Sequence, residues 1–126
     1  MASHYLISRN GDIYALVEEG KRAWHAGESQ MCFEDDTRCM VNDFSIGIEL
    51  IATETSGFTD AQYKSLSELI NNIIERHPIC SIVGHENIAP ARKTDPGQFF
   101  DWQYLKEQLS QLGMVINMIR FPSLAC

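Results

Sequence analysis

Residues 84–97 read Gly84-His85-Glu86-Asn87-Ile88-Ala89-Pro90-Ala91-Arg92-Lys93-Thr94-Asp95-Pro96-Gly97 and follow an apolar run from Ile79 to Val83. Two prolines fix φ and two glycines permit tight turns, so we expect a stiff loop at the end of a strand. His85 and Asp95 offer an imidazole and a carboxylate, which are both ligands of zinc. Lys93, between them, could present positive charge to an oxyanion. The alternative is a solvated loop in which Lys93 pairs weakly with Asp95.

A second carboxylate stands in an apolar segment upstream of this loop. Phe44 to Ile51 is mostly apolar and is interrupted only by Ser45, Gly47 and Glu49, which predicts a buried strand. A carboxylate in such a strand is costly unless it is paired, hydrogen-bonded or placed beside a metal. Glu49 is therefore a candidate functional residue, and the alternative is a strand-end glutamate that faces solvent.

The N-terminal part predicts a hairpin followed by loops. His4 to Ser8 and Asp12 to Val17 are rich in β formers and are joined through an Asn-Gly pair, a strong hairpin signal. Lys21 to Gly27 is a loop that contains Trp24 and His25, for which an anchor and a hydrogen-bonded surface histidine are the simple interpretations. Glu28 to Val41 is expected to be a long surface loop.

Two helices are predicted in the second half. Thr59 to Gln62 forms a capping box, and apolar residues then recur at helical spacing until His77 and Pro78, where His77 is expected to act as a C-terminal cap. Asp101 to Leu112 predicts a second helix that ends at Gly113. The final run, Met114 to Phe121, is apolar and favours β structure.

Composition restricts the classes of function. The chain has 126 residues and a net charge of −7, so we expect one domain over residues 1–126 and no basic stripe for nucleic acid. No apolar run is long enough to span a bilayer, and we expect a cytoplasmic protein without a membrane partner. The four cysteines are expected to be free thiols, with Cys80 in the core; a Cys32–Cys39 disulfide is the alternative.

Four segments, taken in order, resemble the cytoplasmic AmpD-like zinc amidases (amidase type 2), which cut N-acetylmuramyl-L-alanine bonds and are related to peptidoglycan recognition proteins. The resemblance covers residues 4 to about 102 and leaves the role of residues 114–126 open. It implies a mixed α/β fold with a central mixed sheet flanked by helices. The segments are His4 to Gly11, Lys21 to Gly27, Asn42 to Leu50, and the loop of residues 84–97 with Phe100-Asp101-Trp102.

The resemblance also implies roles for individual residues. His85 and Asp95 would hold one zinc ion, Glu49 would transfer protons, and Lys93 would stabilise the tetrahedral intermediate. The resemblance implies a peptidoglycan fragment (muropeptide) as the substrate. The candidates for binding it are Trp24, Arg38 and Arg92. The implied reaction is hydrolysis of the amide between the lactyl group of muramic acid, in free or anhydro form, and L-alanine in cell-wall recycling.

One family feature is absent. Members use three protein ligands for zinc, and the first is a histidine on an apolar strand upstream of the segment that begins here at His4. We therefore expect an N-terminally truncated amidase. The alternatives are that His4, His25 or a cysteine replaces the ligand, or that the chain has lost catalysis and binds peptidoglycan fragments. A sheet edge left unpaired invites self-association, and Met114 to Phe121 is a candidate to cover it.

Overall fold

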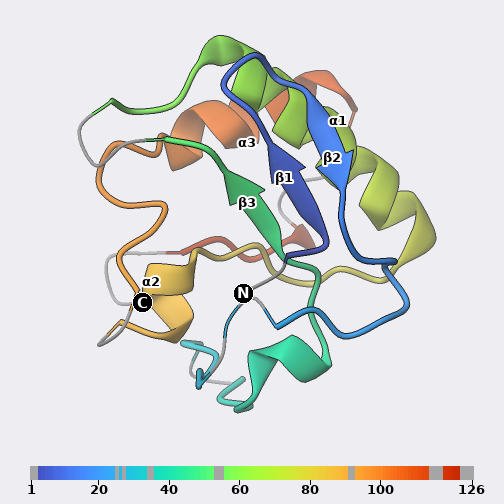
Figure 1. The fold of residues 1–126 in the computed structure, drawn as a ribbon, viewed down its shortest axis with the longest axis vertical. Coiled ribbons are helices and arrows are strands. Elements are labelled where there is room, and N and C mark those ends of the chain that lie inside the picture. The colour runs from blue at the N-terminus through green and yellow to red at the C-terminus, as the bar shows by residue number, and fades with distance from the viewer. Residues whose placement is uncertain are drawn as a thin grey trace.

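The fold is built on a small mixed sheet (Figure 1). The computed structural model describes residues 3–24, 26, 28–33, 36–52, 56–90, 93–113 and 118–122. Strands β1 (Tyr5–Ile7), β2 (Ile13–Ala15) and β3 (Ile48–Leu50) lie in the order β2-β1-β3. β1 pairs with β2 antiparallel and with β3 parallel, which confirms both the hairpin and the mixed α/β class.

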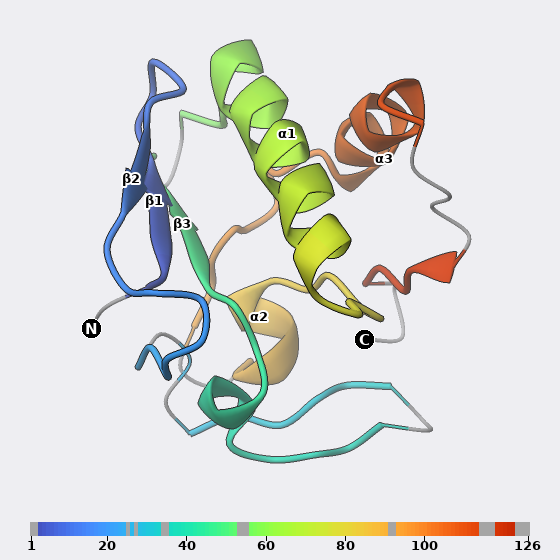
Figure 2. The ribbon, with the colours of Figure 1, turned by 90° about the vertical axis from the view of Figure 1, so that its right-hand side faces the viewer.

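Two long helices lie on one side of this sheet (Figure 2). α1 (Asp60–Arg76) begins at Thr59, whose side chain accepts the backbone N–H of Gln62 in the expected capping box. α3 (Trp102–Gln111) begins at Asp101, whose carboxylate accepts the backbone N–H of Tyr104. Both predicted helices are thus confirmed. Two short helices, η1 (Val41–Asp43) and α2 (His85–Ile88), belong to the loops.

The hydrophobic core lies between the sheet and the two long helices. The apolar stripe of α1 packs against α3 and against the inner face of β1, and burial of these side chains is the main stabilising contribution. Among the described residues, no helix is long and apolar enough to cross a membrane. The buried members of this core are Ile7, Tyr63, Leu66, Leu69, Ile70, Ile73, Phe100, Leu105 and Leu109.

Two expected strands differ from the structure. Phe44 to Ile51 is a strand only from Ile48 to Leu50, and Phe44 is exposed. Ile79 to Val83 is not a strand; it makes one isolated parallel bridge, between Ser81 and Arg120. The described end of the C-terminal run therefore pairs with residues 79–83 and not with the hairpin, while residues 114–117 lie outside the described residues.

The cysteines also depart from expectation. Cys80 is exposed, because it lies on the irregular segment after α1 and not in a core strand. Cys39 and Cys80 are free thiols, so the alternative Cys32–Cys39 disulfide does not form. Cys32 takes part in a disulfide, which contradicts the expectation that every thiol is free.

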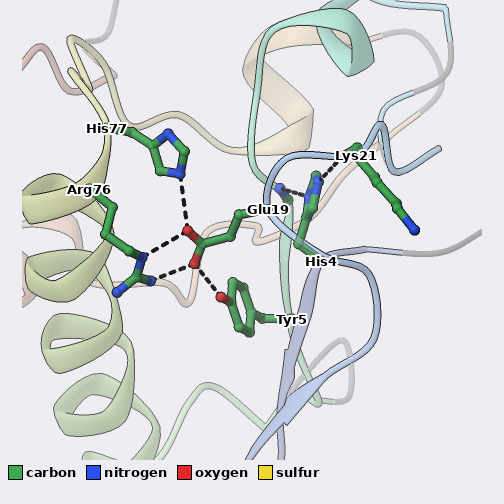
Figure 3. Close-up of polar contacts among 7 residues, drawn as sticks. His4, Tyr5, Glu19, Lys21, Arg76 and His77 are labelled. Carbon is green, nitrogen blue, oxygen red and sulfur yellow. Dashed lines mark hydrogen bonds and ion pairs between the residues drawn. The ribbon is translucent and has the colours of Figure 1, made fainter.

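A half-buried carboxylate ties the segment after β2 to the end of α1 (Figure 3). Glu19 accepts hydrogen bonds from Tyr5 and from both the Nε and the NH2 nitrogen of Arg76, and its Oε1 lies 3.0 Å from His77 Nε2. His77 occupies the predicted C-cap position, and its ring contacts Glu19. The hydrogen bond from Arg76, helped by those from Tyr5 and His77, lowers the pKa of Glu19 from 4.5 to about 2 despite burial.

We expect Glu19→Gln to lower the free energy of unfolding by about 2 kcal/mol at pH 7. Because the folded pKa lies below the unfolded one, this stability is present above about pH 4.5 and is lost as pH falls toward 2. Urea unfolding of both proteins at several pH values measures the difference. Glu68→Gln, at an exposed position of α1, is the control. If the difference in the free energy of unfolding between Glu19→Gln and the wild type were the same at pH 7 and pH 2.5, the lowered pKa of Glu19 would be contradicted.

Candidate metal centre

Three side chains from two segments, β3 and the loop of residues 84–97, meet at one place. Nδ1 of His85 lies 2.5 Å from Oδ2 of Asp95 and 3.9 Å from Oε1 of Glu49. One ligand atom from each residue lies within 4.8 Å of the other two. The His85 side chain is only 10% exposed, whereas those of Glu49 and Asp95 are 40% and 51% exposed. The cluster is thus open to solvent on its carboxylate side.

Glu49 reaches the cluster because of strand alternation. Ile48 and Leu50, its neighbours on β3, pack against the hydrophobic core, and successive side chains of a strand point to opposite faces. Glu49 therefore points away from the core. The expected buried carboxylate is half-exposed, and it lies beside His85 without the full cost of desolvation.

Hydrogen bonds from backbone N–H groups connect different parts of the loop of residues 84–97. The N–H of Glu86 donates to the carbonyl of Asp95 at 2.9 Å, and the N–H of Gly84 donates to Oδ1 of Asn87 at 2.8 Å. Lys93 donates its backbone N–H to Ala89. The first of these bonds joins the residue after His85 directly to Asp95. The loop is consequently fixed where the two predicted ligands meet, and its first turn is α2, which the sequence analysis did not predict.

Gly84 permits this close approach. A Cβ atom on Gly84 would lie 2.4 Å from Cδ of Pro96, far inside a normal contact distance. We expect Gly84→Ala to push the Asp95–Pro96 segment away from His85 and to destabilise the fold by about 1–3 kcal/mol. Thermal unfolding and zinc titration measure the two effects. Gly20→Ala is the matched control, because a Cβ there meets nothing within 4 Å. If the two variants had equal melting temperatures and equal zinc affinities, the close packing of Gly84 against Pro96 would be contradicted.

The charges in the cluster favour an ionised Asp95. Burial acts to raise the pKa of this carboxyl, but the hydrogen bond from His85 and the positive charges of His85 and Lys93 outweigh it. The pKa of Asp95 therefore lies below its usual value. An ionised carboxylate can bind a metal cation, and the imidazole can do so in its neutral form.

The cluster forms part of the lining of a cavity of about 390 Å³. One side of the cavity is formed by residues 44–50, including β3, and another by residues 78–85. Most of its remaining lining is apolar, and α1 and α3 contribute part of it. Glu49, His85 and Asp95 thus bring polar and charged groups to a mostly apolar lining.

The other candidate residues take different positions. Arg38 lines the cavity, makes an ion pair with Asp36 at 2.8 Å and lies over the ring of Phe44. Trp24 is 57% exposed, with Arg22 over its ring at 5.3 Å. Lys93 contributes its charge to Asp95. Arg92, like His25, lies outside the described residues, so its predicted role stays a prediction.

His4 does not replace a metal ligand. Its ring is fully buried, with Nδ1 accepting the N–H of Gly47 at 3.0 Å and Nε2 lying 2.7 Å from the carbonyl of Lys21 (Figure 3). Because Nδ1 accepts, Nε2 donates, and neither ring nitrogen is left for a metal. The buried polar ring instead joins the start of β1 to the segment before β3.

The residues fit a zinc ion by their chemistry. An imidazole and a carboxylate, with a second carboxylate beside them, form a donor set that zinc accepts, and the separations within 4.8 Å allow one ion to be shared. His85 and Asp95 would hold it, with Glu49 facing it. Sequence reasoning identified all three residues but did not anticipate that Glu49 is close enough to be a ligand itself. Gly84 was expected to permit a tight turn, but its φ of −90° is ordinary, and what it permits is the close approach of Pro96, which was not anticipated.

Comparison with known proteins points to one family. The family model described as N-acetylmuramoyl-L-alanine amidase matches residues 1–98. The 1,6-anhydro-N-acetylmuramyl-L-alanine amidase AmpD of Citrobacter freundii is 51% identical over 104 residues, which cover 81% of this chain and 54% of that protein. The chain therefore spans about half the length of the curated relatives that it matches.

Solved structures agree with the sequence comparisons. The crystal structure of a selenomethionine AmpD derivative is 46% identical, with a TM-score of 0.77, and the match covers 86% of this chain and 59% of that one. The Escherichia coli amidase AmiD, in complex with the substrate anhydro-N-acetylmuramic acid-L-Ala-D-γ-Glu-L-Lys, is 38% identical with a TM-score of 0.72. That match covers 85% of this chain and 47% of AmiD.

Proposed function

This chain belongs to the N-acetylmuramoyl-L-alanine amidase family, and we propose that it hydrolyses the amide between the lactyl group of anhydro-N-acetylmuramic acid and L-alanine in peptidoglycan fragments. The observation that carries the proposal is the meeting of Glu49, His85 and Asp95 in the lining of one cavity. The anhydro form is favoured because similar proteins carry it in their names or in their bound substrate. We also place the reaction in cytoplasmic cell-wall recycling, since the sequence resembles cytoplasmic amidases.

We assign the metal to His85 and Asp95. A zinc ion there would lower the pKa of a bound water and polarise the scissile carbonyl. The role of the loop is to hold the two ligands at a fixed separation, which the hydrogen bond from Glu86 to Asp95 supports. Preorganisation of this kind matters because metal position determines which carbonyl oxygen is polarised.

Glu49 is assigned the proton transfers. Its carboxylate oxygen lies 3.9 Å from His85 Nδ1, close enough to reach a water held between them, and it is open to solvent. It would take a proton from the attacking water and then deliver it to the leaving amine of L-alanine, as a general base and then a general acid. Lys93, whose charge already acts on Asp95, would stabilise the negative oxygen of the tetrahedral intermediate.

Substrate contacts are assigned to Trp24, Arg38 and Arg92. An arginine fork pairs with both oxygens of a carboxylate, and muropeptides carry several carboxylates. Trp24 is exposed and offers a flat apolar surface for a sugar ring. Arg38 is engaged by Asp36, so binding of a peptide carboxylate there would compete with that ion pair.

A second candidate function follows from the ligand count. If Glu49 transfers protons, only His85 and Asp95 remain as ligands in the described part of the site, whereas a catalytic zinc usually has three protein ligands. This favours, as the alternative, a binding domain for peptidoglycan fragments with impaired catalysis. The two functions share the same cleft and differ in turnover.

Incubation of the chain with anhydro-N-acetylmuramyl-tripeptide and zinc distinguishes the amidase from the binding domain. Amidase activity is expected to release a peptide with a free L-alanine amine, detected by mass spectrometry, and chelation should stop the release. A rise in melting temperature without cleavage would support the binding domain instead. Neither cleavage nor a shift in melting temperature would contradict both functions.

A further inference from the structure

Two arginine side chains from distant parts of the chain approach one aspartate carboxylate. The segment of residues 30–39 folds back on itself through two isolated bridges, and it carries both Asp36 and Arg38. Arg38 donates from Nε and from its NH2 nitrogen to the two carboxylate oxygens of Asp36, in each case at 2.8 Å. The NH2 nitrogen of Arg120 lies 3.8 Å from Oδ2 of the same carboxylate. Asp36 therefore lies between two guanidinium groups.

Each guanidinium group is held over an aromatic ring. The Arg38 group lies 4.1 Å from the ring centroid of Phe44, and the Arg120 group lies 4.4 Å from that of Phe33. The backbone of Arg120 is fixed as well, because its N–H and its carbonyl both bond to the segment of residues 79–83. Stacking on a ring orients the planar donor fork before an anion arrives. Less side-chain entropy is then lost on binding.

The carboxylate between the arginines is sheltered, and the arginines themselves are not. The side chain of Asp36 is 9% exposed, whereas those of Arg38 and Arg120 are 61% and 37% exposed. The hydrogen bonds from Arg38 keep the pKa of Asp36 below its usual value, so this carboxylate is charged at neutral pH. Arginine forks bind ligand carboxylates in the same bidentate way. Here a carboxylate of the chain itself takes that place.

We propose that Arg38 and Arg120 form a subsite for a carboxylate of the substrate peptide, and that Asp36 is a built-in competitor which limits its affinity. The inference rests on the proposed function, since Arg38 lines the same cavity as the candidate metal centre. Arg120 lies beyond the residues 1–98 that the family model matches, so that match does not imply its role.

The charges select a small carboxylate as the ligand. The chain carries a net charge of −7, which repels a polyanion. A single carboxylate, in contrast, can take the place of Asp36 beside the two guanidinium groups with little change in local charge. The exchange is feasible because ion pairs of solvent-exposed arginines are weak, and Arg38 is largely exposed.

Titration calorimetry with a substrate fragment tests the proposal. The probe is the tripeptide L-Ala-D-γ-Glu-L-Lys, the peptide part of the substrate in the AmiD complex, and it is titrated into the whole chain without zinc. Asp36→Asn keeps the shape of the side chain and removes its charge. We expect Asp36→Asn to bind the tripeptide about tenfold more tightly than the wild type does. A tripeptide with amidated carboxylates should show no such gain.

Two further variants make the test specific. Glu107→Gln, at an exposed position of α3, removes the same charge elsewhere and should bind the tripeptide as the wild type does. Arg120→Gln, added to Asp36→Asn, should cancel the gain in affinity. Circular dichroism verifies that each variant folds. If Asp36→Asn does not fold, Arg120→Gln alone decides, because it should weaken binding of the tripeptide by about threefold or more.

Three results would overturn the proposal. They are equal or undetectable binding of the tripeptide by Asp36→Asn and the wild type, weaker binding by Asp36→Asn, and an equal gain for the amidated tripeptide. Weaker binding would make Asp36 a support for residues 30–39 and not a competitor. The titration needs neither zinc nor cleavage, so it is independent of the amidase test. Cleavage without an effect of Asp36→Asn would contradict only the subsite, and tighter binding without cleavage would contradict only the amidase.

Discussion

Replacing Glu49 by Gln is expected to lower the rate of muropeptide hydrolysis by about 10²–10⁴-fold, the usual contribution of a general acid-base group. The amide side chain keeps the size of the carboxylate but cannot accept the proton of the attacking water. Because His85 and Asp95 are unchanged, zinc content should remain as in the wild type. The measurement is the rate of release of the L-alanine peptide, together with zinc per chain.

Glu86→Gln is the matched control for Glu49→Gln. Glu86 follows His85 directly and is the nearest carboxylate in sequence, but it does not belong to the cluster. Its replacement should leave the rate within a small factor of the wild type. Loss of zinc along with activity in Glu49→Gln would show that Glu49 is a ligand and not the proton carrier.

Replacing His85 by Ala is expected to weaken zinc binding by about 100-fold or more, since the imidazole is the only nitrogen ligand of the cluster. It also removes the hydrogen bond that lowers the pKa of Asp95, so this pKa should rise toward its ordinary value. Zinc titration with a competing chelator measures the first effect, and NMR titration of the carboxyl carbon measures the second.

His77→Ala controls for the loss of an imidazole elsewhere. His77 contacts Glu19 at the end of α1 and lies outside the described cluster, so its removal should lower stability without changing zinc affinity. Equal zinc affinity of His85→Ala and wild type would show that the metal, if bound, is held by other residues.

Local signals in the sequence predict the helices and the hairpin well. The capping box at Thr59 and the carboxylate cap at Asp101 involve neighbouring residues, so the two helices form where expected. The Asn-Gly pair likewise specifies the β1–β2 hairpin, and Gly11 has φ of +87° in that turn.

Long-range pairing explains what sequence reasoning missed. Ile79 to Val83 has the composition of a strand, but strand formation needs a partner, and the described structure provides one only at Arg120. β3 is shorter than expected for the same reason, because only Ile48 to Leu50 lie opposite β1. The exposure of Cys80 follows from the missing strand.

The candidate site was predicted through resemblance and not through spacing. One histidine and one aspartate ten residues apart are common in loops, and nothing local reveals that Glu49, on a distant strand, lies beside them. The close contact between Gly84 and Pro96 likewise depends on the folded structure and cannot be seen in the local sequence. The cavity between β3 and residues 79–83 could not be predicted, because it depends on two segments that do not pair.

The zinc content of the purified chain tests the proposed metal centre most directly. The chain is dialysed to equilibrium against dilute zinc, and the bound metal is then measured by mass spectrometry. We predict about one zinc per chain for the wild type, as expected for a single catalytic site, and far less for His85→Ala and Asp95→Ala. No zinc on the wild type, or equal zinc on all three proteins, would contradict a metal centre built from His85 and Asp95.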